Sequence, residues 1–556
     1  MAQQRIWGTL HPFYETGPVM GRKEANAGFL TTLLRENPFD AYHFFIKTFE
    51  EKQHLEQTLQ SRFPAMWENG RFSLFPVVDL SLLVQRQAYS CFHLSDWVQD
   101  YVSLAIIRNA CSRNLFPLTA PVHTLSYASF GPQLFRHIWP GVTKRDRIVA
   151  TSTATHEVLE TYFSQFRSGY GLGSSMPSPA LAQIPLGMDM ADFASPEEKE
   201  AAGREVREKL AVGTATVFLS FSRISPLSKM DCMPFFDAFC LARDNGLDLS
   251  TCRFVMAGTL ADKALADTLV QHAKERGVPF SLVAFPDQPN PALRKALFAA
   301  ADVFLSPVDN VQETFGLTIL EAFAASLPVI ASAIDGYKDL VDHESDGFLL
   351  PTLGPSSLEN TTAIAPLVMP DFAHLFMAQQ CVVDLPAFGK AIHRLGVEAE
   401  TRRQMGQNGR NKVLARYTWT SVVKDYLALW ARLAGEQLTA EEEARARTAR
   451  HPIFPDYANV FKGYFSDVAS SPAIRERRIT VSAKGSALLE GKGGFALYKL
   501  MQPRLDVAAL PLLLEAARNT PTFGELADDA ARPNRVADRD SHILWLLKHG
   551  YLEFSE

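Results

Sequence analysis

Apolar positions recur in two different rhythms along the chain, and one stretch shows both in order. Val303–Ser306 is a short apolar run ended by Pro307, which predicts a buried strand. From Leu317 the apolar positions are spaced for one face of a helix, and Pro328 ends that pattern before a second apolar run at Val329–Ser332. The pattern predicts strand, glycine loop, helix and strand in succession.

Similar apolar runs recur along most of the chain, separated by helical patterns. In the first part they are Ile6–Leu10, Ala41–Ile46, Phe92–Leu94, Leu118–Val122 and Arg147–Ala150, and in the second part they are Thr216–Phe221, Arg253–Gly258 and Ser281–Phe285 with the two runs already described. Strands that alternate with helices predict parallel sheets with crossover helices, whose ligand loops lie at the carboxyl ends of the strands. We therefore expect two α/β domains, residues 1–195 and residues 196–410.

The loop after Val303–Ser306 is the strongest candidate for a site. Glu313 lies in this loop, the glycine turn Phe315–Gly316 leads into the helix, and Glu321 lies inside the helix. A helix N-terminus approached through glycine offers free backbone N–H groups to an anion, above all to phosphate. Carboxylates this close to phosphate avoid repulsion when they face sugar hydroxyls. The arrangement predicts a sugar nucleotide, with hexose hydroxyls at Glu313 and ribose hydroxyls at Glu321; the alternative is two solvated glutamates on an ordinary α/β unit.

The sequence around these glutamates supports the first interpretation. Glu313-x7-Glu321 is followed by Ala325–Ala331 (Ala-Ser-Leu-Pro-Val-Ile-Ala) and by Asp346–Leu349 (Asp-Gly-Phe-Leu). These motifs together resemble the donor-site signature of the retaining family 4 glycosyltransferases, whose GT-B fold consists of two facing Rossmann-like domains. The resemblance covers roughly residues 1–432 and is stronger in the second domain. It implies that the donor is bound by Glu313, Phe315, Gly316, Leu317, Thr318 and Glu321.

A second loop supplies two cations. Phe221–Met230 follows the first strand of the second domain and resembles the family's Gly-Arg-x-x-x-x-Lys loop, with Ser222 in place of glycine and one extra residue between Arg223 and Lys229. Two cations on one loop neutralise a diphosphate leaving group without a metal. The resemblance implies that Arg223 and Lys229 hold the diphosphate and that no metal is bound; two solvated surface cations are the alternative.

The first domain offers weaker signals. The loop Tyr14–Asn26 contains Gly17 and Gly21, which permit close backbone approach, and the resemblance places a glycine loop near the donor phosphate; which glycine approaches the donor is left open. His123 follows a strand at a position where the family often keeps a histidine facing the donor sugar, and a structural histidine is the alternative. Asp96 ends another strand-like run and either touches the acceptor or caps a helix.

Three further segments organise the larger part of the chain. Ile184–Phe193 resembles the family's Pro-x-Gly-x-Asp hinge, in which we expect Gly187 to make the turn and Asp189 to be structural. Residues 411–440 have apolar positions at helical spacing, and the resemblance implies that their last helix crosses back to the first domain. Residues 355–380 are rich in proline and are predicted to be an insertion.

The composition changes beyond Glu441. Pro452 and Pro455 mark a predicted linker over residues 441–456, and residues 457–556 have the spacing of a small winged-helix-like domain. Residues 457–556 hold 13 Lys and Arg against 12 Asp and Glu, a poor balance for binding DNA. We therefore expect this domain to contact a protein partner.

The overall composition narrows the class of protein. The 556 residues are 47% hydrophobic and 21% charged, with a net charge of −6, which gives no reason to expect nucleic acid as the main partner. The six cysteines are scattered without a Cys-x-x-Cys pair, which argues against structural zinc and against a disulfide scaffold. Since the sequence shows neither a signal peptide nor a stretch long enough to span a membrane, we expect a cytoplasmic protein.

Together with these patterns, the resemblance implies a retaining, metal-independent glycosyltransferase without a cofactor, for which Glu313, His123, Arg223 and Lys229 are the catalytic candidates. Uridine diphosphate sugars are the commonest donors in the resembled family. The acceptor is left open: a glycan, a glycolipid, a small molecule or a protein. Two alternatives remain. One is a non-catalytic GT-B scaffold or regulator acting through residues 457–556, and the other is a GT-B phosphorylase or sugar-phosphate synthase.

Overall fold

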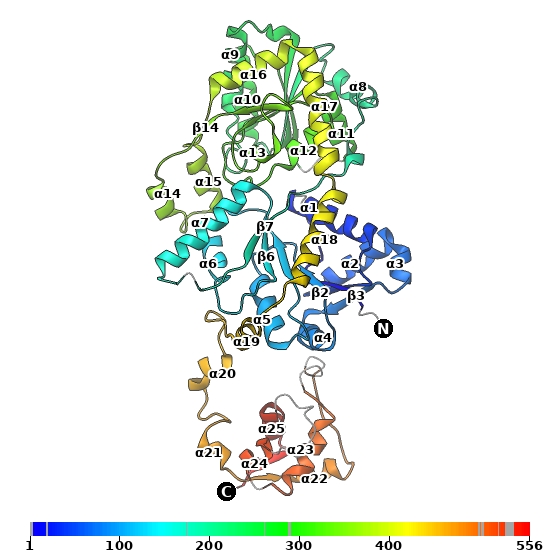
Figure 1. Ribbon diagram of the computed structural model, residues 1–556, viewed down its shortest axis with the longest axis vertical. Helices are drawn as coiled ribbons and strands as arrows, with labels where there is room; N and C mark the ends of the chain where they lie inside the picture. Colours follow the sequence, from blue (N-terminus) through cyan, green and yellow to red (C-terminus); the bar gives the residue numbers. More distant parts are fainter. Residues whose placement is uncertain are drawn as a thin grey trace. The chain divides into compact units, whose positions relative to one another are not determined.

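The chain divides into two compact units, Met1–His451 and Pro452–Glu556. The computed structural model describes residues 4–17, 21–173, 175–260, 262–286, 291–498, 501, 505–520, 522–528 and 539–555. The larger unit contains two α/β domains (Figure 1). The boundary between the compact units falls inside the stretch that the sequence predicts as a linker.

The first domain is built on a parallel sheet in the order β3-β2-β1-β4-β5-β6-β7. Its strands are β1 (Ile6–Thr9), β2 (Ala41–Ile46), β3 (Phe72–Pro76), β4 (Cys91–His93), β5 (Leu118–Pro121), β6 (Asp146–Ala150) and β7 (Ala180–Gln183). Its helices are α1 (Gly21–Glu36), α2 (Phe49–Arg62), α3 (Pro64–Glu68), α4 (Leu80–Arg86), α5 (Tyr101–Cys111), α6 (Phe130–Phe135) and α7 (Thr153–Gly169). The sequence predicted the central strands and missed β3 and β7, which form the two edges.

The second domain is a parallel sheet in the order β10-β9-β8-β11-β12-β13. Its strands are β8 (Thr216–Phe221), β9 (Cys252–Thr259), β10 (Phe280–Phe285), β11 (Val303–Ser306), β12 (Val329–Ser332) and β13 (Gly347–Leu350). Its helices are α8 (Lys199–Lys209), α9 (Met233–Asp244), α10 (Lys263–Arg276), α11 (Pro291–Ala300), α12 (Leu317–Ala324), α13 (Tyr337–Leu340), α16 (Leu385–Val397) and α17 (Ala399–Arg416). The prediction of two Rossmann-like parallel-sheet domains is therefore confirmed.

The chain crosses between the two domains of the larger unit twice, once at the predicted hinge Ile184–Phe193 and once between α17 and α18 (Trp419–Gly435). Helix α17 packs on the second domain, and α18 packs on α1 of the first domain. The apolar stripe of α18, which includes Trp419, Tyr426 and Trp430, is buried in the core of the first domain, because these residues recur at helical spacing. The predicted hinge lies against this helix, since a Cβ on Gly187 would come within 2.8 Å of Trp419 atoms.

Residues in the predicted linker belong in part to the first domain. Helix α19 (Ala440–Thr448) packs on α5. The guanidinium Nη1 of Arg447 donates to the carbonyl oxygen of Ser112 at 2.8 Å, and Ala446 is fully buried. The beginning of the stretch 441–456 is therefore an ordered helix attached to the larger unit.

The predicted insertion forms a pair of helices between two short antiparallel strands. The elements are β14 (Thr352–Leu353), α14 (Glu359–Ile364), α15 (Pro370–Ala378) and β15 (Val382–Val383). They follow the last strand of the second sheet, and in Figure 1 the helix pair stands at the edge of the larger unit.

The smaller unit has a core of its own. Its elements are α20 (Tyr457–Val460), α21 (Pro472–Arg475), β16 (Ile479–Val481), α22 (Ala483–Leu489), α23 (Ala509–Ala517), α24 (Phe523–Asp528), α25 (Arg539–Lys548) and β17 (Leu552–Phe554), with β16 and β17 antiparallel. Among its apolar side chains, Ile543, Leu546 and Tyr551 are buried, whereas Leu544 is 45% exposed. The winged-helix assignment stays a prediction. Among the described residues, the search for a helix long and apolar enough to cross a membrane returned none.

Candidate functional site

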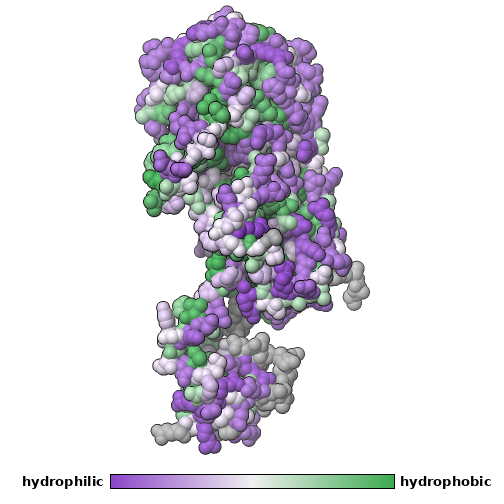
Figure 2. Space-filling model, turned by 60° about the vertical axis from the view of Figure 1, so that its left-hand side comes forward, coloured by the Kyte–Doolittle hydropathy of each residue, from purple (hydrophilic) through white to green (hydrophobic). Residues whose placement is uncertain are grey.

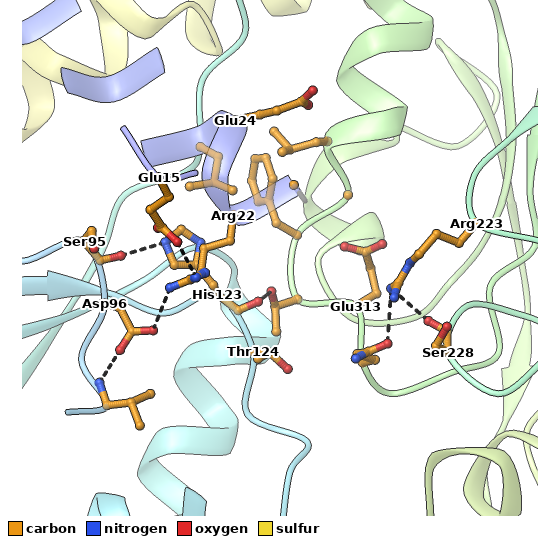
Figure 3. Close-up of a pocket in the computed structure, with 18 of the residues that line it drawn as sticks. Glu15, Arg22, Glu24, Ser95, Asp96, His123, Thr124, Arg223, Ser228 and Glu313 are labelled. Atoms are coloured by element: carbon orange, nitrogen blue, oxygen red, sulfur yellow. Dashed lines mark hydrogen bonds and ion pairs between the residues drawn. The ribbon is translucent and has the colours of Figure 1, made fainter. Parts of the chain in front are cut away.

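A cleft of about 950 Å³ is lined by both domains of the larger unit. It lies where the carboxyl ends of the strands meet, as expected for α/β sheets. Figure 3 shows Arg22, Asp96 and His123 on the side of the first domain and Arg223 with Glu313 on the side of the second. Of the sequence-predicted residues, the cleft is lined by Gly21, Asp96, His123, Arg223, Lys229, Glu313, Phe315, Gly316, Leu317, Thr318 and Glu321.

Glu313 and Lys229 form an ion pair in this cleft. The Lys229 Nζ donates to Glu313 Oε2 at 2.6 Å, and their side chains are 10% and 21% exposed. Burial by itself favours neutral Glu313, but the charge of Lys229 and hydrogen bonds from Lys229 and two backbone N–H groups outweigh it and lower the pKa of Glu313. At Lys229, burial by itself lowers the pKa, but the neighbouring charge of Glu313 outweighs it and raises the pKa. Both groups are therefore charged at neutral pH.

The glycine turn after Glu313 opens α12 toward the cleft. Gly316 precedes the helix with φ of 110°, a left-handed conformation that favours glycine. A Cβ at this position would also lie 2.4 Å from the Tyr337 ring. No larger residue fits there without displacing Tyr337, so the N-terminal N–H groups of α12 remain accessible to an anion.

Glu321 is buried in α12 and paired with a residue that the sequence motifs did not indicate. Arg294 of α11 donates to Glu321 Oε1 and, at 3.2 Å, to Glu24 of α1 in the first domain. Glu321 Oε2 is buried without a hydrogen-bond partner among the described residues. A buried, unpaired carboxylate oxygen at a cleft is suited to accept a ligand hydroxyl.

Arg223 is the more exposed of the two predicted cations. Its Nη2 donates to Ser228 O at 3.1 Å and to Gln312 Oε1 at 3.2 Å (Figure 3). Neither partner carries a charge, so these contacts leave Arg223 available to pair with an anionic ligand. Lys229, by contrast, already interacts with a carboxylate.

His123 lies on the opposite wall and is neutral. Its Nε2 donates to the Ser95 carbonyl oxygen at 3.0 Å and lies 3.2 Å from Asn26 Oδ1. Burial, assisted by the charge of Arg22, lowers the pKa of His123 to about 4. His123 therefore acts as a hydrogen-bonding group near neutral pH, since it carries no charge there.

The two candidate glycines differ in position. Gly21 begins α1, and a Cβ on it would lie 3.6 Å from the side chain of Leu317, the first residue of α12. The N-termini of these two helices therefore face one another across the cleft. Gly17 has φ of 88° but is not among the described residues that line the cleft. Residues 18–20 of this loop lie outside the described residues.

The two aspartates singled out in the sequence stabilise turns. Asp96 accepts from the Val98 N–H at 2.6 Å, while the next helix begins at Tyr101, so it caps a turn and not a helix. Asp96 also faces Arg22 at 3.8 Å, and burial raises its pKa. Asp189 accepts from the Ala191 N–H at 3.0 Å, in agreement with a structural role.

Sequence reasoning missed a polar cluster at the first-domain wall. Asp100 Oδ2 lies 2.9 Å from His11 Nε2 and 2.5 Å from Lys47 Nζ. Burial opposes ionisation of Asp100, but the hydrogen bonds from His11 and Lys47 outweigh it and lower the pKa of Asp100 to about 2. The three residues belong to separate elements, so no spacing in the sequence could indicate them.

The loop that carries Glu313 is hydrogen-bonded to the first domain on both sides of that residue. Before it, Gln312 Nε2 donates to Tyr127 Oη at 2.7 Å. After it, Thr314 Oγ1 donates to the His123 carbonyl oxygen at 2.6 Å, and the Thr314 carbonyl oxygen accepts from Ser152 Oγ at 2.9 Å. The position of Glu313 therefore depends on both domains.

Residues 205–361 match the family described as "Glycosyl transferases group 1". The alpha-monoglucosyldiacylglycerol synthase of Streptococcus pneumoniae is 29% identical over 219 residues, which cover 39% of this chain and 46% of that protein. The D-inositol 3-phosphate glycosyltransferase of Actinosynnema mirum is 29% identical over 211 residues, which cover 38% of this chain and 46% of that protein. The chain thus spans about half the length of these curated relatives.

The fold has counterparts among solved structures. The N-terminal domain of trehalose-6-phosphate phosphatase from Candida albicans is similar with a TM-score of 0.51 and 12% identity, over 77% of this chain and 97% of that chain. At this identity the similarity concerns the fold alone. The GT-B fold predicted for the larger unit is confirmed.

Proposed function

We propose that the chain transfers a sugar from a nucleoside diphosphate sugar to an acceptor, because residues 205–361 match the glycosyl transferases group 1 family. One observation carries this proposal. The charged pair of Glu313 and Lys229, the N-terminus of α12 and the partly unpaired carboxylate of Glu321 all line one cleft. These groups are suited to bind an anionic diphosphate and the hydroxyls of two sugars.

In the proposed reaction, each group acts on a different part of the donor. Arg223, Lys229 and the N–H groups of α12 stabilise the departing diphosphate. Glu313 orients the sugar and stabilises the positive charge that develops at its anomeric carbon, and His123 hydrogen-bonds the sugar from the other wall. The acceptor hydroxyl attacks on the face from which the diphosphate leaves, which retains the anomeric configuration, and the leaving phosphate accepts the hydroxyl proton. Positioning and fixed charge provide most of the rate enhancement.

The donor that we expect is a uridine diphosphate sugar, with Glu321 accepting from the ribose hydroxyls. A thermal-shift screen of nucleotide sugars tests the proposal, because a ligand at 100 times its dissociation constant adds about 2.7 kcal/mol of stability. We expect stabilisation by at least one nucleotide sugar and by its nucleoside diphosphate, and none by the free sugar. If no nucleotide stabilises the protein, it is a non-catalytic scaffold and the proposal is wrong.

Retention and metal independence are tested separately, once a donor is known. Donor hydrolysis and transfer should survive chelation with EDTA, because the proposed groups neutralise the diphosphate themselves. Proton NMR of the product should show the anomer of the donor. Strict dependence on a divalent cation, or inversion at the anomeric carbon, would contradict the mechanism.

We further propose that residues 457–556 contact a protein partner.

A further inference from the structure

The insertion after β13 exposes a group of large apolar side chains. We call this group the insertion patch; it comprises Leu353, Ile364, Leu367, Met369, Phe372, Phe376 and Val382. Leu367 is 85% exposed and Met369 is 67% exposed. Hydrophobic side chains gather on this part of the surface in Figure 2, which brings the side of α14 and α15 forward. Single exposed apolar residues are normal, whereas a contiguous group of them marks a contact surface.

The charges of the segment restrict what this surface contacts. Residues 353–382 contain no lysine and no arginine, and their only carboxylates are Glu359 and Asp371. A surface that binds anionic lipid or an acidic protein needs basic side chains, each of which contributes attraction at short range. The partner of the insertion patch is therefore uncharged and apolar where it makes contact.

The insertion patch is fixed beside the cleft. Asp371, which precedes Phe372, lines the cleft. His374 is fully buried, donates from Nε2 to the Ser126 carbonyl oxygen at 3.2 Å, and packs on the Tyr127 ring at 5.2 Å. Tyr127 in turn accepts from Gln312 next to Glu313. The insertion patch is thus adjacent to the cleft.

The position of Leu367 and Met369 favours a lipid bilayer over a protein as the partner of the insertion patch. Leu367 and Met369 lie in the turn between α14 and α15 and project from it, since they are 85% and 67% exposed. A projecting apolar turn needs a complementary pocket in a protein partner, but it enters fluid hydrocarbon without any matching shape. Leucine, methionine and phenylalanine are also side chains that partition into the interface of a bilayer.

We propose that the insertion patch docks on the uncharged surface of a lipid bilayer and so presents the cleft to an acceptor held in that membrane. The proposal rests on the proposed function for the identity of the cleft, but docking itself requires neither donor nor turnover. The attraction is the burial of apolar side chains, so it does not depend on anionic lipid and is not weakened by salt.

Vesicle flotation of the full-length protein tests the proposal. Vesicles of phosphatidylcholine alone should bind the protein to the same extent at low and high salt, and adding phosphatidylglycerol should not be required. The double variant Leu367→Ser, Met369→Ser should bind about tenfold to a hundredfold more weakly, since two apolar contacts are lost. The control Val270→Ser, Leu414→Ser also removes two half-exposed apolar side chains, on α10 and α17, and should bind as the unaltered protein does.

Each other outcome overturns the proposal. These outcomes are no binding to phosphatidylcholine, binding only when phosphatidylglycerol is present, and equal loss in both double variants. Analytical ultracentrifugation without lipid adds one more: if the protein is a dimer that Leu367→Ser, Met369→Ser dissociates, the patch is an interface between two copies. Nucleoside diphosphate binding by calorimetry should be the same in all variants, so failure of the proposed function is recognised separately.

Discussion

The Glu313 carboxylate is kept ionised by Lys229, and this pairing decides what each replacement will do. The carboxylate, whose side chain is 21% exposed, has an ammonium group at 2.6 Å. Removing one partner of a buried pair leaves the other uncompensated. A change at Lys229 therefore acts on the donor phosphate and on the pKa of Glu313 together, whereas a change of Glu313 to its amide keeps the shape and removes only the charge.

Glu313→Gln should lower donor turnover by about a hundredfold or more, because fixed charge at the reacting centre contributes this much when one group is removed. Affinity for the nucleoside diphosphate should stay within a few-fold, since Lys229 is retained. Calorimetry and donor hydrolysis measure the two quantities. Glu344→Gln, a change at a carboxylate 59% exposed, is the control. Near-normal turnover in Glu313→Gln would show that this residue has another role.

Arg223→Ala should weaken binding of the nucleoside diphosphate by about 1.5–3 kcal/mol, the value of a charge-assisted hydrogen bond. The melting temperature should not change, because the guanidinium is exposed and its partners are uncharged. Lys229→Ala should also weaken binding, but with a lower melting temperature, since it leaves Glu313 buried alone. The exposed Arg403 provides the control, as Arg403→Ala. Equal affinity in Arg223→Ala and the control would exclude the predicted phosphate contact.

At the scale of elements, the sequence predicts the strands that are continuous apolar runs and misses three of the four edge strands. Thr216–Phe221 was predicted with its observed bounds, because a strand buried on both faces is a continuous apolar run. The edge strands β3, β7 and β13 were missed, whereas the edge strand β10 was predicted from its apolar run. The residues of β3 are at most half-buried and end in Pro76, and those of β7 have exposed ends and no β-branched side chain. The half-solvated residues of β3 and β7 therefore leave no clear period in the sequence.

The residues of the candidate site also divide into those that the sequence reveals and those that it does not. Glu313, Gly316 and Glu321 lie on one loop and one helix, so their spacing reveals them, and the cation loop after β8 is equally local. Arg294 comes from α11 and contacts Glu321 only through the packing of two helices. The contacts of Thr314 with the first domain join parts of the chain separated by 159 to 191 residues. Such contacts depend on tertiary structure and leave no signal at any fixed spacing.

The loop contacts lead to a prediction for Thr314. Thr314→Val keeps the shape of the side chain but removes the hydroxyl that donates to the His123 carbonyl oxygen. Donor hydrolysis should fall roughly tenfold, since a small displacement of a positioned group lowers the rate. Affinity for the nucleoside diphosphate should not change. Thr314→Ser keeps the hydroxyl and should restore hydrolysis; if it is as slow as Thr314→Val, packing and not the hydrogen bond positions Glu313.

At the scale of the whole molecule, buried histidines make the first domain sensitive to acid. Burial lowers the pKa of His43, His123 and His137 to about 4 and that of His93 to about 3. These groups are neutral in the folded protein and take up protons on unfolding below the ordinary histidine pKa near 6.5. Their contribution to stability is therefore present above that pH and is lost as the pH falls toward about 4.

The melting temperature should therefore fall steadily as the pH is lowered from about 6.5 to 4, with a loss of about 1.4 kcal/mol per pH unit for each histidine in its window. Differential scanning calorimetry at a series of pH values measures this. His93→Phe removes one titrating group from an aromatic cluster that includes Phe29 and Trp430, so its melting temperature should depend less steeply on pH. A melting temperature constant over this range would refute the assignment.

Deleting residues 457–556 should leave a soluble protein that binds its donor. The cleft is lined entirely by residues before 372, and the smaller unit has a separate core. A second deletion, of residues 437–556, is the control. It also removes α19 and the contacts of Arg447 with the first domain, and should lower the melting temperature. Calorimetry measures donor affinity in the full-length protein and in both deletion variants. Loss of affinity in the shorter deletion would show that residues 457–556 belong to the catalytic fold.

The two crossings between the domains meet at Met188, whose N–H donates to the Tyr417 carbonyl oxygen at 2.7 Å while its own carbonyl oxygen accepts from Trp419 at 3.3 Å. If two domains are joined along one line, that line is the axis of any rotation between them, and residues near the axis move least. Phe315, two residues after Glu313, has its ring 6.4 Å from that of Tyr417. We therefore expect Glu313, the proposed catalytic carboxylate, to move little if the two domains rotate about this line to admit an acceptor.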